Sequence, residues 1–335
     1  MEKGSKWMLT VSMKLIVAIV ATCFVFIVAL TFGAAQTGVG DVWGALFNTR
    51  TSDLIVMLQE IRIPRVVAAV IVGAALAVAG AIMQGMTRNP LADPGLIGLT
   101  AGANAALALT IALLPNVNYF GLMIACFIGA AVGAALVLGI GSQQRGGLSS
   151  FRIILAGAAI SAFLHAIAEG IGLYFKISKD VSMWTAGGLI GTTWVQLQIV
   201  IPIILIGLLL AILFSKQLTI LSLSEEVATG LGQKTFAVKL VLFLLTVVLA
   251  GAAVSLVGNL VFVGLMIPHI VRILVGMDYR AIVPMSAIIG AAFMLLADTA
   301  ARTVHAPFET PVAAIVALLG LPFFLLIVRK GGKAL

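Results

Sequence analysis

Two ionisable side chains, His165 and Glu169, interrupt an otherwise uncharged stretch from Ile153 to Phe175. Their spacing of four positions places both side chains on one face of a helix. Ionisable groups inside a membrane are costly, and they usually face a cavity or each other. The pair therefore lines a solute path or relays protons, or it is a mutually satisfied pair between helices, or it lies near enough to the outer surface to be wet. The pattern leaves these alternatives open.

Three arginines, Arg62, Arg65 and Arg302, form a second set of charges with possible binding chemistry. Arg62 and Arg65 flank Pro64 before one apolar run, and Arg302 follows another. Arginine pairs with carboxylates in a fork geometry, so this set predicts a docking surface for an acidic partner. Local pairs are the alternative: Arg302 with Asp298 at a spacing of four, and Arg62 with Glu60. Docking and local pairing are compatible.

The polar segment from Lys216 to Lys239 is the third feature. Ser222-Leu223-Ser224-Glu225 matches a capping box, which predicts that a short helix starts at Ser222. An apolar stripe of Val227, Ala228 and Leu231 would follow, and Gly230 or Gly232 would end the helix. Such a helix suits a groove in another protein, although a helix lying on the membrane or a solvated loop is equally compatible.

The sequence shows no motif for covalent chemistry or nucleotide binding. In Gly230-Leu231-Gly232-Gln233-Lys234-Thr235, Gln233 stands where a P-loop requires glycine, and no strand pattern precedes the string. Cys23 and Cys126 both lie in apolar runs, where they are expected to be buried hydrophobic residues rather than a disulfide or a metal site. We therefore expect no enzyme, no cofactor and no resident metal. Energised transport would need a separate ATPase subunit.

The elements that position these residues follow from composition. Of 335 residues, 62% are hydrophobic and 10% charged, and the mean hydropathy is +1.21. A soluble chain has about a quarter of its residues charged and a disordered one is rich in polar residues, so both classes are excluded. The apolar runs are continuous rather than alternating, which favours membrane helices over a β-barrel. The net charge of +8 does not indicate nucleic-acid binding, because basic loops on the inner side of a membrane explain it.

Ten membrane spans are predicted within one domain covering residues 1–335. The expected spans are Lys14 to Asp41, Val66 to Thr87, two within Pro94 to Gln144 separated by a turn at Pro115 to Asn118, Ile153 to Phe175, Val195 to Ser215, Leu240 to Val257, Leu265 to Leu274, Ala281 to Val304, and Pro311 to Val328. With the N-terminus inside, 13 basic residues lie on the inner side and 6 on the outer side, Arg272 being within a span. This bias predicts that both termini are cytoplasmic.

An internal repeat is also predicted. Gly73 to Gly80 is similar to Gly251 to Gly258 at an offset of 178, which relates the second span to the seventh. An even span paired with an odd one gives two half-repeats of inverted topology, about 60–175 and about 238–329, joined through the cytoplasmic loop at 216–239. Inverted repeats are typical of transporters. Glycines four positions apart, at Gly98/Gly102, Gly129/Gly133 and Gly187/Gly191, predict close helix packing.

Four long motifs resemble the iron-siderophore and vitamin B12 permease family of ABC importers. They are Arg62-Ile63-Pro64-Arg65 through Gln84-Gly85-Met86-Thr87-Arg88-Asn89-Pro90-Leu91-Ala92-Asp93-Pro94-Gly95; Leu223-Ser224-Glu225-Glu226-Val227-Ala228 with Leu231-Gly232; Phe262-Val263-Gly264-Leu265-Met266-Ile267-Pro268-His269; and Leu296-Ala297-Asp298-Thr299-Ala300-Ala301-Arg302 followed by Glu309-Thr310-Pro311-Val312. The resemblance extends over almost the whole chain in order.

The resemblance implies two permease subunits around a central path, two cytoplasmic ATPases and an external binding protein. It implies that Arg62, Arg65 and Arg302 meet glutamates of the binding protein. It also assigns ATPase coupling to the loop and path lining to the helix of His165 and Glu169. The residues so assigned to coupling are Ser222, Ser224, Glu225, Glu226, Gly230 and Gly232.

The cargo is the least defined part of the prediction. Trp184-Thr185-Ala186-Gly187-Gly188 keeps the family's tryptophan and paired glycines, but the neighbouring residues do not identify a ligand. The chain as a whole resembles the iron(III)-hydroxamate branch. In that branch a heterodimer with a second permease is common, so a heterodimer or a homodimer is expected. Cobalamin and haem remain alternative cargoes. A self-sufficient secondary transporter or channel, and a structural membrane scaffold, are the rival classes.

Overall fold

The computed structural model describes residues 2–33, 37–47, 52–142, 150–306 and 308–329. All the regular secondary structure in this part of the chain is helical, and no β-strand occurs among these residues. Seven helical runs are long and apolar enough to cross a membrane, and three shorter apolar helices correspond to the third, eighth and tenth predicted spans. The prediction of an all-α integral membrane protein is confirmed. Arg50, Arg145, Lys330 and Lys333, which contribute to the predicted charge bias, lie outside the described residues.

The described residues of the first half of the chain form ten helical elements. They are α1 (Glu2–Thr31), α2 (Val39–Phe47), α3 (Asp53–Met57), a π-helical turn η1 (Leu58–Arg62), α4 (Ile63–Thr87), a 3-10 turn η2 (Pro94–Ile97), α5 (Leu99–Leu113), α6 (Tyr119–Ser142), α7 (Ser150–Tyr174) and α8 (Ser178–Thr185). α3, η1 and α4 form one continuous helix of 35 residues. The sequence had suggested that Arg62 and Arg65 precede the helix. The structure shows that they lie inside it.

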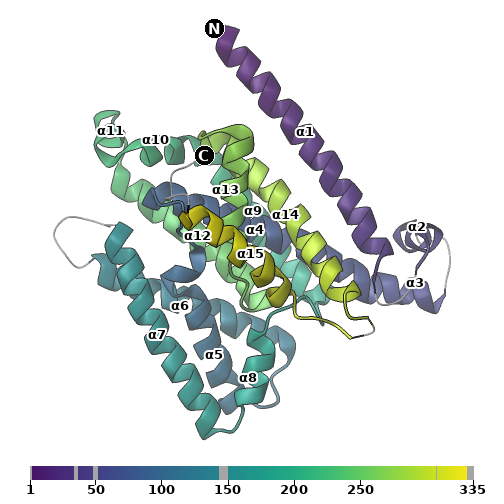
Figure 1. Ribbon diagram of the computed structural model, residues 1–335. Coiled ribbons are helices and arrows are strands. Elements are labelled where there is room, and N and C mark those ends of the chain that lie inside the picture. Colours follow the sequence, from purple (N-terminus) through teal and green to yellow (C-terminus); the bar gives the residue numbers. More distant parts are fainter. Residues whose placement is uncertain (1, 34–36, 48–51, 143–149, 307, 330–335) are drawn as a thin grey trace.

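The second half begins with α9 (Trp194–Leu213), α10 (Ser215–Leu223) and α11 (Glu225–Gly230). It continues with α12 (Thr235–Val257), α13 (Val263–Val275), α14 (Tyr279–Thr303) and α15 (Val312–Arg329). Figure 1 shows both ends of the chain on the side of the molecule that carries α10 and α11, and α8 on the opposite side. The two short helices after α9 therefore mark one membrane face and α8 marks the other.

α4 is the centre of the core. It is buried along most of its length and packs on α12, α13 and α14, whereas α1 contacts mainly α14 and exposes most of its apolar surface (Figure 1). Apolar side chains facing outwards are expected where the solvent is lipid rather than water.

Helix pairing supports the inverted repeat. α4 packs on α14, and α12, the counterpart of α4, packs on α6, the counterpart of α14. The helix ends define a different offset from the glycine strings. α4 ends at Thr87 and α12 at Val257, 170 positions apart rather than 178. The Gly73 string lies in mid-helix, while Gly258 already caps α12, so the strings are not at equivalent positions.

Candidate translocation groove, outer arginine cluster and inner coupling segment

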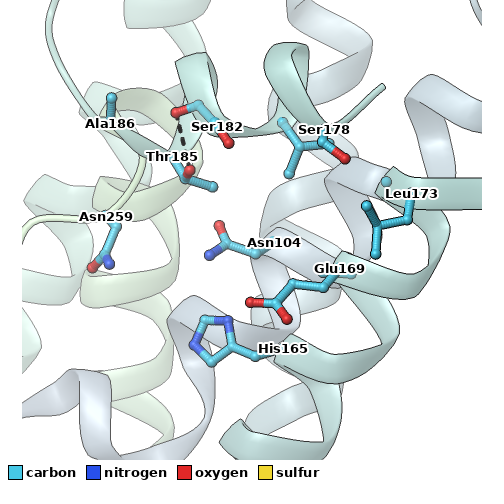
Figure 2. Close-up of a pocket in the computed structure, with 12 residues that line it drawn as sticks. Asn104, His165, Glu169, Leu173, Ser178, Ser182, Thr185, Ala186 and Asn259 are labelled. Carbon is cyan, nitrogen blue, oxygen red and sulfur yellow. Dashed lines mark hydrogen bonds between the residues drawn. The ribbon is translucent and has the colours of Figure 1, made fainter. Parts of the chain in front are cut away.

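A cavity of about 600 Å³ lies between α5, α7, α8 and the loop that follows α12. α7 supplies His165 and Glu169, α5 supplies Asn104, and the loop supplies Asn259. Figure 2 shows these four side chains directed towards a common space from three sides. The spacing of four positions thus brings His165 and Glu169 to one face, as the sequence predicted.

His165 and Glu169 do not satisfy each other. Both are exposed in the isolated chain, and no hydrogen bond or ion pair joins them within the described structure. Asn104 is only 7% exposed, and its amide likewise has no hydrogen-bonding partner among the described residues. A buried polar group without a partner is expensive unless water or a ligand reaches it. The groups are therefore oriented towards the cavity rather than towards the protein.

A second cavity, of about 450 Å³, adjoins the first and shares His165 and Asn259 with it. Its lining includes Asp93 and Gly95 from the segment around η2 and Phe262 from the loop before α13. Irregular backbone at membrane depth is tolerated only where it is buried in protein or lines a water-filled space. Both interruptions of helix structure, at η2 and before α13, lie beside these cavities. We call the two adjoining cavities the groove.

The three arginines come together at the end of the molecule opposite α11, but they are buried. Their exposed fractions are 6% for Arg62, 5% for Arg65 and 4% for Arg302. Arg65 binds Asp298 at 2.8 Å through Nε and donates from Nη1 to both oxygens of Glu309 at 2.8 Å. Asp298 also pairs with Arg302 at 2.9 Å, which is the local pair considered in the sequence analysis. We call Arg62, Arg65, Asp298, Arg302 and Glu309 the arginine cluster.

Arg62 and Arg302 also hold the C-terminal end of α1. Arg62 Nη1 donates to the carbonyl of Leu30 at 3.0 Å, and Arg302 Nη2 donates to that of Ala29 at 3.0 Å. The last carbonyls of a helix have no partner inside the helix, so cations are favoured there. Within the arginine cluster Glu309 is the most accessible member, with a side chain 31% exposed, and Arg65 Nη2 is buried without a hydrogen-bonding partner.

The segment from Lys216 to Lys239 forms two helices rather than one. Ser222 lies in the last turn of α10 and donates to the carbonyl of Thr219 at 2.7 Å, so the prediction of a helix start at Ser222 is wrong. The N-cap of α11 is Ser224, whose hydroxyl accepts from the amide of Val227 at 3.0 Å. Ser222 and Ser224 lie two positions apart, and the sequence pattern of a helix N-cap fits both of them. The one that is already hydrogen-bonded within α10 cannot serve as the cap.

Gly232 supplies the stop after α11. Its φ is +79°, and the amide of Gln233 donates to Ala228 while that of Gly232 donates to Thr229. These two bonds form a Schellman motif, which requires a left-handed residue at that position. Gly230 is still helical, and no described atom lies within 4 Å of the position that a Cβ would take there.

Leu223 at the end of α10, Val227 in α11 and Leu231 at the C-cap of α11 expose 66%, 46% and 66% of their surface. Ala228, which the sequence predicted to share an apolar stripe with Val227 and Leu231, is instead fully buried. The acidic residue Glu225 binds Lys239 of α12 at 2.7 Å, and this contact ties the short helix to a long one. We call Leu223, Val227 and Leu231 the apolar stripe.

Sequence reasoning missed α8, Asn104, Asn259 and Lys239 as parts of these sites. Asn104 was detectable as the only amide or charged side chain between Asp93 and Asn116. Lys239 was detectable only as a basic residue at a span end, because its partner Glu225 lies 14 positions away in another helix. Among the described residues, no three His, Cys, Asp or Glu side chains gather as a potential metal site.

Comparison with known proteins decides the family. The model of the FecCD transport family matches residues 20–330. The chain belongs to the FecCD transport family. This FecCD chain is 45% identical over 324 residues to the "Iron(3+)-hydroxamate import system permease protein FhuB" of Bacillus subtilis, covering 96% of this chain and 84% of that protein. It is 39% identical to the "Hemin transport system permease protein HmuU" of Yersinia pestis, covering 91% and 93% respectively.

Solved structures agree with the FecCD assignment. A protein assigned as a metal-chelate type ABC transporter, in an inward-facing conformation, matches with a TM-score of 0.82 at 26% identity, over 95% of this chain and 99% of that one. PsaBC from Streptococcus pneumoniae matches with a TM-score of 0.60 at 20% identity, over 85% of this chain and 94% of that one, which shows a shared fold. The FecCD chain is a multi-pass membrane permease.

Proposed function

We propose that this chain is the permease subunit of a binding-protein-dependent ABC importer for an iron(III)-siderophore, of the hydroxamate type. The observation that carries the proposal is the 45% identity, over nearly the whole chain, to a permease named for iron(3+)-hydroxamate import. The assembly would contain a second permease subunit, identical or homologous, two cytoplasmic ATPases and an external binding protein. The chain itself would form one transmembrane domain and hydrolyse no ATP.

The groove is the proposed path for the chelate. It is open at the exposed face of α7, and its unpartnered side chains Asn104, His165 and Glu169 line it. A second subunit placed against this face would close the groove into a channel. A bulky, wrapped metal ion needs a wide path with few strong contacts, and a cavity of about 600 Å³ with scattered polar groups is compatible with this need.

The apolar stripe is the proposed contact with the ATPase. It lies on the side of the molecule that carries both chain ends, which we place in the cytoplasm. Three exposed apolar side chains on the end of α10, on α11 and at its C-cap, outside the membrane runs, suit insertion into an apolar groove of a partner. Glu226 is fully exposed beside the stripe and is a further contact candidate, whereas Glu225 is held by Lys239.

The arginine cluster is the proposed docking point for the binding protein. Because the three guanidinium groups are buried, a partner carboxylate would reach Arg65 by replacing Glu309. The unsatisfied Nη2 of Arg65 and the partial exposure of Glu309 favour such an exchange. The guanidinium group of Arg65 can form the same charge-assisted hydrogen bonds with Glu309 or with a carboxylate of the binding protein.

Reconstitution tests the function directly. The complete importer, with its ATPases and loaded binding protein, should take up labelled ferric hydroxamate when ATP is inside the vesicles. Competition by ferric catecholate, haem and cobalamin would rank the alternative cargoes. Uptake driven by an ion gradient in vesicles that hold this chain alone would contradict the proposal and favour a secondary transporter. No uptake under any of these conditions would favour a scaffold.

A further inference from the structure

The groove is acidic. Among the described residues that line its two cavities, the carboxylates are Glu169 and Asp93, and there is no lysine or arginine. The basic residues nearest to Glu169 along the chain are Lys176, between α7 and α8, and Lys179, in α8. Neither lysine lines a cavity. Apart from the imidazole of His165, which lines both cavities, a charged chelate inside the groove would therefore meet negative potential without a basic side chain to compensate it.

Of the two carboxylates, Glu169 can be substituted with the smaller disturbance of the surrounding structure. Its carboxylate is exposed to the larger cavity and has no hydrogen bond or ion pair within the described structure. Figure 2 shows the carboxylate between the Asn104 and His165 side chains. Asn104 is 7% exposed and has no hydrogen-bonding partner among the described residues. Asp93, by contrast, accepts a hydrogen bond from the amide of Gly95 at 2.8 Å and caps η2, so its removal would disturb the backbone.

Iron chelates differ in charge according to their donor groups. Three hydroxamate monoanions neutralise iron(III), and a pendant ammonium makes such a complex cationic. Three catecholate dianions leave a trianion, and carboxylate chelates are also anionic. Passage of an anionic chelate beside an unpaired carboxylate is disfavoured by Coulomb repulsion, which is only partly screened in a groove of this kind.

We infer that Glu169 sets the charge selectivity of the groove, admitting neutral and cationic chelates and disfavouring anionic ones. The inference rests on the proposed function and goes beyond it, because it assigns part of cargo selection to the permease rather than to the binding protein. Two unit charges about 6 Å apart in a half-hydrated site change a rate roughly tenfold. We expect an effect of about this size for each unit of ligand charge. In a homodimer the second copy of Glu169 would add to it.

The test uses one chelate scaffold in three charge states. A linear tris-hydroxamate with a terminal amine gives a cationic ferric complex, its N-acetyl derivative a neutral one and its N-succinyl derivative an anionic one. Uptake is measured in vesicles with the complete importer, at saturating concentrations of loaded binding protein, for the wild type, Glu169→Gln and Glu169→Lys. Glu60→Gln, which removes an exposed carboxylate away from the groove, is the matched control.

The cationic and anionic complexes differ by two charge units, so the ratio of cationic to anionic uptake should fall about a hundredfold in Glu169→Gln and further in Glu169→Lys. It should stay unchanged in Glu60→Gln. An unchanged ratio in Glu169→Gln, with transport retained, would overturn the inference. Loss of all three substrates in Glu169→Gln, with a normally folded and assembled importer, would also overturn it, because the role would not depend on ligand charge. If the wild type takes up none of the three complexes, the proposed function fails, and the inference fails with it.

Discussion

Arg65 of α4 and Asp298 of α14 form a salt bridge of 2.8 Å across 233 positions of sequence. Both side chains are almost completely buried, and Asp298 serves Arg302 at the same time. A buried ion pair holds two helices in register, and loss of one partner leaves an uncompensated charge. The cluster therefore has a structural role whatever partner it meets, and this determines how its variants must be interpreted.

Arg65→Glu should lower the amount of folded protein rather than remove docking alone. The change would place a third carboxylate beside Asp298 and Glu309, and breaking a buried pair costs about 3–5 kcal/mol. Thermal unfolding in detergent, with Lys179→Glu as an exposed control of the same charge change, measures the effect. A normal melting temperature for Arg65→Glu would show that the cluster is not needed for stability.

Glu309→Gln should strengthen binding of the external protein. It removes the carboxylate that occupies Arg65 without removing any arginine, and its side chain is 31% exposed, so the fold should tolerate the change. Affinity measured on the purified permease complex, compared with Asp180→Asn as an exposed control, tests the exchange. Weaker binding by Glu309→Gln would instead make Glu309 part of the docking surface.

Lys239→Met should weaken the coupling of ATP hydrolysis to transport. Glu225 would lose its bond of 2.7 Å to α12, and a half-exposed ion pair contributes about 0.5–1 kcal/mol. ATP consumed per chelate imported should rise about two- to fivefold. Lys234→Met is the control, and the charge swap of Lys239→Glu with Glu225→Lys should restore coupling. If the swap fails while the fold is intact, the contact is not a pairwise link.

Gly232→Ala and Gly230→Ala should have opposite effects on α11. Gly232 has a φ of +79°, where a Cβ costs roughly 1 kcal/mol, whereas Gly230 is helical with open space around it, so alanine favours the helix there. Hydrogen exchange of α11 in the assembled importer would show faster exchange for the first variant and slower exchange for the second. Equal behaviour would contradict the Schellman stop.

Hydropathy predicted the membrane helices well because each span needs a minimum length of apolar residues. It could not place helix starts, because hydrogen bonding continues beyond the apolar part; the helix that contains Arg65 begins at Asp53. α8 and α10 are short and not strongly apolar, so they gave no signal. The packing glycines were partly predictable. Gly102 and Gly129 meet backbone to backbone, whereas Gly187 and Gly191 lie outside the helices.

The candidate site was predictable in its local parts only. The spacing of His165 and Glu169 is a property of one helix, so the sequence was sufficient to place them on one face. The burial of Arg62 and Arg65 depends on contacts with α1 and α14, which no local pattern encodes. Ser222 and Ser224 carry nearly identical signals, and only the end of α10 distinguishes them.

The open side of the groove has a consequence for how the cell must produce this protein. A copy without its partner would expose Glu169 and His165 to the surrounding lipid, and ionisable side chains that face lipid are costly. A subunit that has not assembled with its partner would therefore be recognised and degraded by membrane quality control. If the second permease subunit is a different chain, the two chains would have to be synthesised in matched amounts.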